Sequence, residues 1–95
     1  MTITHFKSPI GLIVYKDSDD DHYTITGTIP EDVTVRSMES AYDLEDLLKK
    51  KVQHVGIEFD SEFSSFFAYA KSKDLAVQFV KNCEEYFYKV RDMLY

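Results

Sequence analysis

The 95-residue sequence has little of what most catalytic, metal-binding and redox motifs require. It contains one cysteine, three glycines and no tryptophan, and its three histidines, His5, His22 and His54, stand far apart. One cysteine cannot form an intramolecular disulfide, so we expect a reducing, cytoplasmic environment. The separated glycines form no phosphate-binding loop, and no Cys and His spacing matches a zinc site. We therefore expect no metal, no cofactor and no enzymatic activity.

Positive charge and long apolar runs are also scarce. The 17 Asp and Glu residues outnumber the 11 Lys and Arg residues, which gives a net charge of −6. This balance opposes binding to nucleic-acid phosphates or to an anionic membrane. The one basic run, Lys49–Lys51, is more typical of a helix C-terminus than of a nucleic-acid site. No apolar run approaches the roughly 18 residues of a membrane span, and the start of the chain lacks a signal-peptide pattern.

Aromatic residues, by contrast, are abundant. Seven Tyr and seven Phe make up 15% of the chain, and hydrophobic residues together make up 44%. A chain of this length folds as a single domain, residues 1–95, with one modest core. We expect that core to take about half of the aromatic side chains and to leave the others for another surface.

The first third of the chain predicts a β-hairpin. Ile10–Tyr15 is a short apolar, β-branched run, and His22–Ile29 alternates between apolar and polar residues. Asp17–Asp21, between these two stretches, favours a turn. Residues Ile3–Phe6 predict a further short strand at the N-terminal side.

The rest of the chain predicts a helix, a second hairpin and a longer helix. The first helix would begin at the N-cap Ser37 and end at Lys49–Lys51. Gln53–Phe59 and Phe63–Ala70 alternate and predict two strands. From Leu75 onward, apolar residues recur at three- and four-residue steps, as in an amphipathic helix. The predicted fold class is α+β, an antiparallel sheet of four to five strands in ββαββα order with two helices packed on one face.

Helices on one face leave the other face of the sheet open. The alternation of apolar and polar residues predicts which side chains face the helices, namely Tyr23, Ile25, Val55, Ile57 and Phe59. The side chains predicted on the opposite face are Thr24, Thr26, Thr28, His54 and Glu58. In the strand predicted at Phe63–Ala70, one face carries Phe63, Phe67 and Tyr69 and the other carries Phe66, Ala68 and Ala70. In the strand predicted at Ile10–Tyr15, Ile13 and Tyr15 lie on the face opposite to Leu12 and Val14. Whichever face packs inward, large side chains stay outside, as at protein interfaces. The alternatives are the edge of the core or a homodimer interface.

The acidic turn after the first strand allows three interpretations. Asp17, Asp19 and Asp21 have the 1-3-5 spacing of an EF-hand loop, but His22 occupies the glycine position and Thr28 the position of the bidentate Glu. A solvated hairpin turn is therefore favoured over a calcium site. The third interpretation uses the charge without a metal, because a field of acids steers a basic partner at high association rates.

Two acidic clusters would supply such a field. The first consists of Asp17, Asp19, Asp20, Asp21, Glu31 and Asp32, and the second of Glu58, Asp60 and Glu62. Catalytic groupings are poor by comparison. His54 and Glu58 would share a strand face without a nucleophile nearby, and Cys83 lies on the apolar stripe of the last helix, where a buried structural thiol is expected.

The second half of the chain resembles a known family. The stretch from Gly56 to Ala70, followed by an alanine-bearing amphipathic helix, resembles small immunity proteins of bacterial polymorphic toxin and contact-dependent inhibition systems. In one such family a strand ends in Asp-x-Glu and the next carries an aromatic-x-Ala-Tyr signature. The residues standing in those positions here are Asp60, Glu62, Phe67, Ala68 and Tyr69.

The resemblance implies a cytoplasmic protein that binds a cognate toxin domain and neutralises it stoichiometrically. Many such toxins are basic nucleases, so acidic loops would pair with their Lys and Arg while aromatic residues anchor the contact. The residues expected to bind the partner are Asp17, Asp19, Asp20, Asp21, Glu58, Asp60, Glu62, Phe67 and Tyr69. Two other classes remain open. One is a phage-encoded inhibitor, such as an anti-CRISPR protein or a nucleic-acid mimic, and the other is a small binding module that forms a homodimer.

Overall fold

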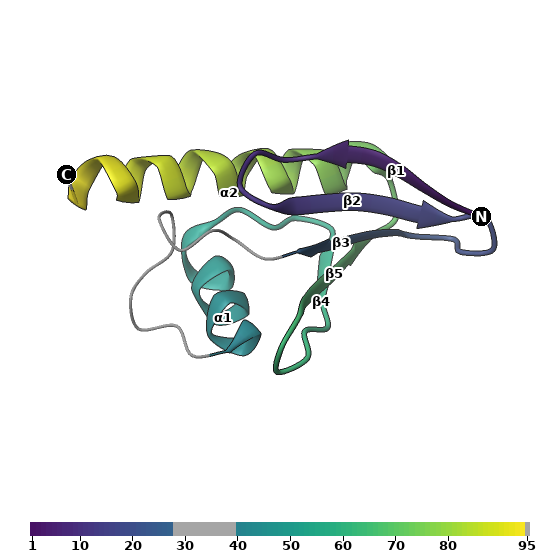
Figure 1. The fold of residues 1–95 in the computed structure, drawn as a ribbon, viewed down its shortest axis with the longest axis horizontal. Helices are drawn as coiled ribbons and strands as arrows, with labels where there is room; N and C mark the ends of the chain where they lie inside the picture. Colours follow the sequence, from purple (N-terminus) through teal and green to yellow (C-terminus); the bar gives the residue numbers. More distant parts are fainter. Residues whose placement is uncertain (28–39, 95) are drawn as a thin grey trace.

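Five antiparallel strands and two helices make up the structure, a computed structural model that describes residues 1–27 and 40–94 (Figure 1). The strands are β1 (Thr2–Lys7), β2 (Leu12–Asp17), β3 (Tyr23–Gly27), β4 (Ile57–Phe59) and β5 (Phe66–Ala70), and the helices are α1 (Ala41–Lys51) and α2 (Lys73–Leu94). The α+β class is confirmed, with the N-terminal strand added to the predicted ββαββα order. Within the described ranges, neither helix is both long and apolar enough to cross a membrane.

The sheet joins two hairpins through its central pair of strands. Its order is β1-β2-β3-β5-β4, so the hairpin β2–β3 meets the hairpin β4–β5 where β3 pairs with β5. In that pair Thr24 lies opposite Tyr69 and Thr26 lies opposite Phe67. Because side chains alternate along each strand, these four side chains share one face of the sheet.

The core lies entirely against the other face. Leu12 and Val14 of β2 and Ile25 of β3 are fully buried there, as the alternation of each strand requires. α2 lies against β2, β3, β4 and β5, while α1 packs on β5. The helices complete this core with Leu44, Leu48, Ala76, Phe79, Val80, Cys83 and Phe87. Both helices therefore cover one face, as predicted, because the apolar residues of each lie at three- and four-residue steps along one side.

Three predicted positions differ in the structure, all near β4 and β5. Val55 was expected in the core but is 75% exposed, because β4 begins only at Ile57. Gly56, the residue before β4, has φ +76°, a conformation that interrupts an extended strand. His54 lies before this break, with its ring 5.4 Å from that of the core residue Phe59, so its placement on the open face was wrong.

The second strand of that hairpin is also shorter than predicted. β5 begins at Phe66, and Phe63 lies in the preceding turn with 68% of its surface exposed. Phe63 therefore does not share a strand face with Phe67. The backbone carbonyl of Phe63 instead accepts a hydrogen bond from Ala41 N at 3.0 Å, which brings the turn to the start of α1.

The start of the first helix is defined at its N-cap. α1 begins at Ala41 after Ser40, whose backbone N–H donates to Asp43 Oδ2 at 3.2 Å. The predicted cap Ser37 lies outside the described residues, as do the remaining sequence predictions at Thr28, Ile29, Glu31 and Asp32. Lys49, Lys50 and Lys51 form the last turn of α1, as their opposite charge to the helix C-terminus favours.

Candidate functional site

The face of the sheet opposite the helices carries two rows of side chains that run across the strands. One row is Tyr15, Thr24, Tyr69 and Glu58, and the next contains Ile13, Thr26 and Phe67. Both rows follow from the register, because residues directly opposite in neighbouring strands point to the same side. We call Ile13, Tyr15, Thr24, Thr26, Phe67 and Tyr69 the open face.

Large side chains shield the centre of the open face. Thr24 is only 4% exposed although neither α1 nor α2 lies over it, because the register places Tyr15 on one side of it and Tyr69 on the other. Thr26 satisfies its hydroxyl within the sheet by donating to the carbonyl of Phe66 at 2.8 Å. Tyr15, Phe67 and Tyr69 remain half-buried. The open face thus combines apolar rings with no unpaired polar group at its centre, as the central part of a protein interface does.

Carboxylates border the open face along β4 and the turn that follows. Glu58 lies beside Tyr69 in the register, and Asp60 N donates to the carbonyl of Phe67 at 2.9 Å. Tyr69 Oη donates to Asp60 Oδ2 at 3.4 Å. Burial raises the pKa of Tyr69, and the charge of Asp60, its hydrogen bond, Tyr15 and Glu62 raise it further. The predicted residues Glu58, Asp60, Glu62, Phe67 and Tyr69 are therefore brought together.

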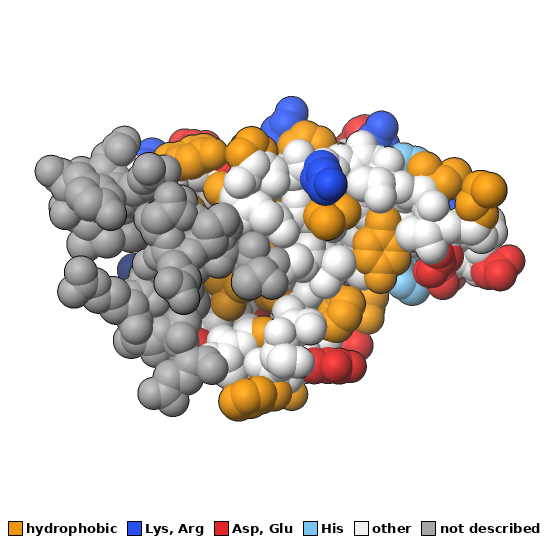
Figure 2. All heavy atoms as spheres, viewed as in Figure 1, with side chains coloured by type: hydrophobic (Ala, Val, Ile, Leu, Met, Phe, Trp, Pro, Cys, Tyr) orange, Lys and Arg blue, Asp and Glu red, His pale blue; other side chains and the backbone are white. Residues whose placement is uncertain are grey.

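The other acidic cluster lies in the connection between β2 and β3. Asp17 accepts a hydrogen bond from the Thr2 hydroxyl, and its carbonyl accepts one from Asp20 N at 3.0 Å, which closes the turn. Asp19 is exposed, and Asp21 extends into solvent with its carboxylate 3.3 Å from His22 Nδ1. Figure 2 shows acidic side chains at the end where Figure 1 places this connection, and others near the β4–β5 turn.

His22 brings the two acidic clusters into one region. Its ring packs edge-on against that of Tyr69, with centroids 4.7 Å apart, although the two residues are far apart in sequence. A groove of about 780 Å³ runs past this pair at the end of the sheet, and Asp21, Glu58 and Lys71 also line it. The groove therefore joins Asp21 to Glu58, whereas the other acids of the two clusters in the described residues, Asp17, Asp19, Asp20, Asp60 and Glu62, do not line it.

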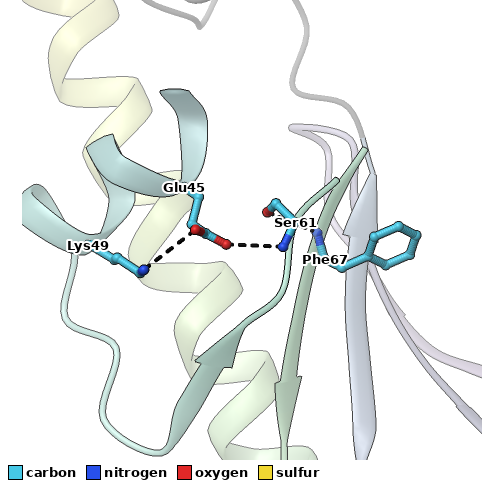
Figure 3. A network of polar contacts seen from close by, with 4 residues as sticks. All are labelled: Glu45, Lys49, Ser61 and Phe67. Carbon is cyan, nitrogen blue, oxygen red and sulfur yellow. Dashed lines mark hydrogen bonds and ion pairs between the residues drawn. The ribbon is translucent and has the colours of Figure 1, made fainter. Parts of the chain in front are cut away.

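A contact from α1 fixes the acidic turn (Figure 3). Glu45 Oε1 accepts a hydrogen bond from Ser61 N at 3.1 Å, and Glu45 Oε2 lies 3.5 Å from Lys49 Nζ. Ser61 Oγ in turn accepts from Phe67 N at 3.3 Å. In Figure 3 the Phe67 ring points away from both helices, toward the open face. α1 thus anchors the segment between Asp60 and Glu62 from the helix-covered side of the sheet, and neither of the two described helices covers the open face.

Chemistry by Cys83 or by a metal finds little support in the residues that the structure describes. Cys83 is fully buried, and burial raises the pKa of its thiol, so the reactive thiolate is disfavoured. No group of three or more His, Cys, Asp and Glu residues is arranged to hold a metal ion within 1–27 and 40–94.

The predicted partner-binding residues did not include Tyr15 of the open face, nor His22, Gly56, Lys71 and Leu75, which line the groove. Tyr15 alternates with Val14, so its face could be assigned once Val14 was known to be buried. His22 gave no signal, because its contact with Tyr69 depends on the pairing of β3 with β5. Comparisons with protein-family models, with curated proteins and with solved structures found no match to this chain.

Proposed function

We propose that this chain is an immunity protein, which binds a cognate bacterial toxin domain in the cytoplasm and neutralises it by stoichiometric protein–protein inhibition. The observation that carries the proposal is the open face, where Tyr15, Phe67 and Tyr69 lie on the side of the sheet opposite α1 and α2 and carboxylates border them. Rigid aromatic side chains supply much of the binding energy at protein interfaces. Further support comes from the resemblance of Asp60, Glu62 and the Phe67–Tyr69 segment to an immunity-protein signature.

Charge indicates the kind of partner. The chain carries a net charge of −6, and Glu58 and Asp60 lie at the border of the open face. A basic toxin domain, such as a nuclease, would be drawn to this border over a long range and would then bury the aromatic side chains. Inhibition would follow because a bound domain of this size blocks the toxin's active site or a surface that the toxin needs.

The experiment is co-expression with the product of the neighbouring gene, which the proposal expects to carry a toxin domain. We expect the two proteins to co-purify in a 1:1 ratio and cells expressing both to grow. The variant Phe67→Ala should lose protection, while Tyr88→Ala, which truncates an aromatic residue that is 40% exposed on α2, should retain it. Retained protection by Phe67→Ala, or the absence of any complex with the wild-type chain, would contradict the proposal.

A homodimer is the second candidate, because the same aromatic side chains would suit a self-complementary interface. Sedimentation of the isolated chain separates the two. A monomer at micromolar concentration leaves the open face available for a toxin. A dimer that Phe67→Ala dissociates and Tyr88→Ala does not would instead assign the open face to self-association.

A further inference from the structure

The groove at the end of the sheet has walls from four parts of the chain, one of which is the end of β5 and the residue after it, with Tyr69 and Lys71. Asp21 and His22 lie before β3, Gly56 and Glu58 lie at the start of β4, and Leu75 lies in the first turn of α2. The volume of about 780 Å³ falls within the range of roughly 300–1,000 Å³ that is common for ligand sites. The groove therefore has room for a side chain of a partner together with the backbone beside it.

An aromatic ring held in a fixed position forms one wall. Tyr69 packs against the edge of His22, with the ring planes at 71° and the centroids 4.7 Å apart. Tyr69 lines the groove, and its hydroxyl donates to Asp60 Oδ2 at 3.4 Å. The electron-rich face of such a ring attracts cations, and it attracts a planar guanidinium most effectively because the two can stack.

Two carboxylates, those of Asp21 and Glu58, and one ammonium group, that of Lys71, line the groove. Glu58 has no ion-pair partner in the part of the chain that the structure describes, and the carboxylate of Asp21 is fully exposed beside His22. Lys71 is the one Lys or Arg that lines the groove, and it forms no ion pair with either acid. Its flexible, exposed side chain can turn away into solvent.

We infer that this groove binds an arginine side chain of the partner protein, with the guanidinium stacked on Tyr69 and hydrogen-bonded to Glu58 and Asp21. Carboxylates bind guanidinium through charge-assisted hydrogen bonds, which are stronger than those between neutral groups. A lysine ammonium would gain the charge contact without the stacking, so arginine is preferred over lysine. The inference deepens the proposed function, on which it rests for the source of the arginine.

The groove is tested without any partner by NMR titration of the ¹⁵N-labelled chain with Nα-acetyl-arginine N-methylamide. We expect saturable shifts centred on His22, Gly56, Glu58 and Tyr69, and no comparable shifts with the citrulline analogue, which has the same shape without the charge. Equal shifts with citrulline, or shifts spread evenly over the surface, would overturn the inference. So would inorganic phosphate shifting the same residues more strongly, because that result would assign the groove to an anion.

Substitutions of opposite charge should change the affinity for the arginine probe in opposite directions. Glu58→Gln should weaken binding of the arginine probe by about fivefold, and Lys71→Gln should strengthen it by a few-fold. Glu85→Gln is the matched control, because it removes the same charge from an exposed position of α2 that does not line the groove, and it should change nothing. Tyr69→Phe should keep most of the binding and Tyr69→Leu should lose it. Equal effects of Glu58→Gln and Glu85→Gln would overturn the inference.

The same variants separate this inference from the proposed function. If the wild-type chain binds the toxin domain but Glu58→Gln and Tyr69→Leu bind it as tightly as Glu85→Gln does, the groove is not the arginine site and the proposed function stands. If no toxin domain is bound while the arginine probe is, the proposed function fails and the chemistry of the groove stands.

Discussion

Glu45 and Ser61 are joined across two elements of the fold, because the carboxylate of Glu45 on α1 accepts a hydrogen bond from the backbone N–H of Ser61 at 3.1 Å. Ser61 lies between Asp60 and Glu62, the two acids of the β4–β5 turn. The Glu45 side chain is only 14% exposed, so water competes weakly for this contact. The position of the Asp60 and Glu62 carboxylates beside the open face therefore depends on Glu45, which lies on α1 on the opposite side of the sheet.

Removing this carboxylate should loosen the turn. We expect Glu45→Ala to lower the free energy of unfolding by about 1–3 kcal/mol, because the Ser61 N–H then loses its charged acceptor. Asp46→Ala, at the next and exposed position of α1, is the control and should cost less than about 0.5 kcal/mol. Urea denaturation measures both, and amide hydrogen exchange at Ser61 should accelerate in Glu45→Ala alone. Equal stability of the two variants would contradict the anchoring role of Glu45.

Tyr69 should ionise at a higher pH than an ordinary tyrosine, because its pKa is raised. Burial and the neighbouring Asp60 raise its pKa above the usual 10, since both disfavour the phenolate in the folded state. The associated stability is intact below about pH 10 and is lost as the pH rises through the pKa of the folded state. A spectrophotometric titration of wild type and Tyr69→Phe should therefore differ by one tyrosine at the alkaline end. Asp60→Asn should move this step to lower pH, and an unchanged step would contradict the coupling.

Cys83 should be protected from thiol reagents. It is fully buried among core residues, and burial raises the pKa of its thiol. Because a raised pKa favours the protonated thiol in the fold, the associated stability is present below about pH 8.5 and is lost as the pH rises above that value. Alkylation in native buffer should be about 10³-fold slower than in denaturant, because it requires unfolding. Similar rates in both conditions would show that the thiol is accessible.

Two glycines should respond very differently to alanine. A Cβ on Gly27 would lie 2.0 Å from the carbonyl oxygen of Gly11, a backbone atom, so Gly27→Ala should cost at least about 2 kcal/mol. At Gly56 the nearest atom is the end of the Leu75 side chain at 2.8 Å, which can move aside. The φ of +76° there predicts a loss of only about 1 kcal/mol for Gly56→Ala. Thermal unfolding of both variants measures the difference, and the reverse order would contradict these contacts.

Periodicity predicted the elements of this fold well where one residue pattern persisted. The three- and four-residue spacing of α2 matches a helix that buries one side, and the alternation from Tyr23 to Gly27 matches a strand that places Ile25 in the core. The same reasoning failed at Val55, because alternation continues through Gly56 in the sequence while the left-handed φ of that glycine turns the backbone. The prediction for Phe63 was wrong as well, because in the sequence an aromatic residue of a turn cannot be distinguished from the first residue of a strand.

Part of the candidate site was predictable from the sequence as a set of residues, but the arrangement of those residues was not. Phe67 and Tyr69 could be placed on one face from their spacing, and their acidic neighbours Asp60 and Glu62 are close in sequence. Their contact with His22 could not be predicted, because it depends on β3 pairing with β5. Strand order is set by the packing of the whole core, and local patterns do not encode it.

The most direct test of the open face as the binding surface is the affinity of this chain for the product of the neighbouring gene, which the proposed function expects to be a toxin domain, measured by titration calorimetry. We predict a 1:1 complex that Tyr69→Ala weakens by at least about 30-fold, corresponding to about 2 kcal/mol. Tyr88→Ala, on α2, should leave the affinity within about twofold of wild type. Equal affinities for Tyr69→Ala and wild type, or a larger loss from Tyr88→Ala, would contradict the assignment of the open face.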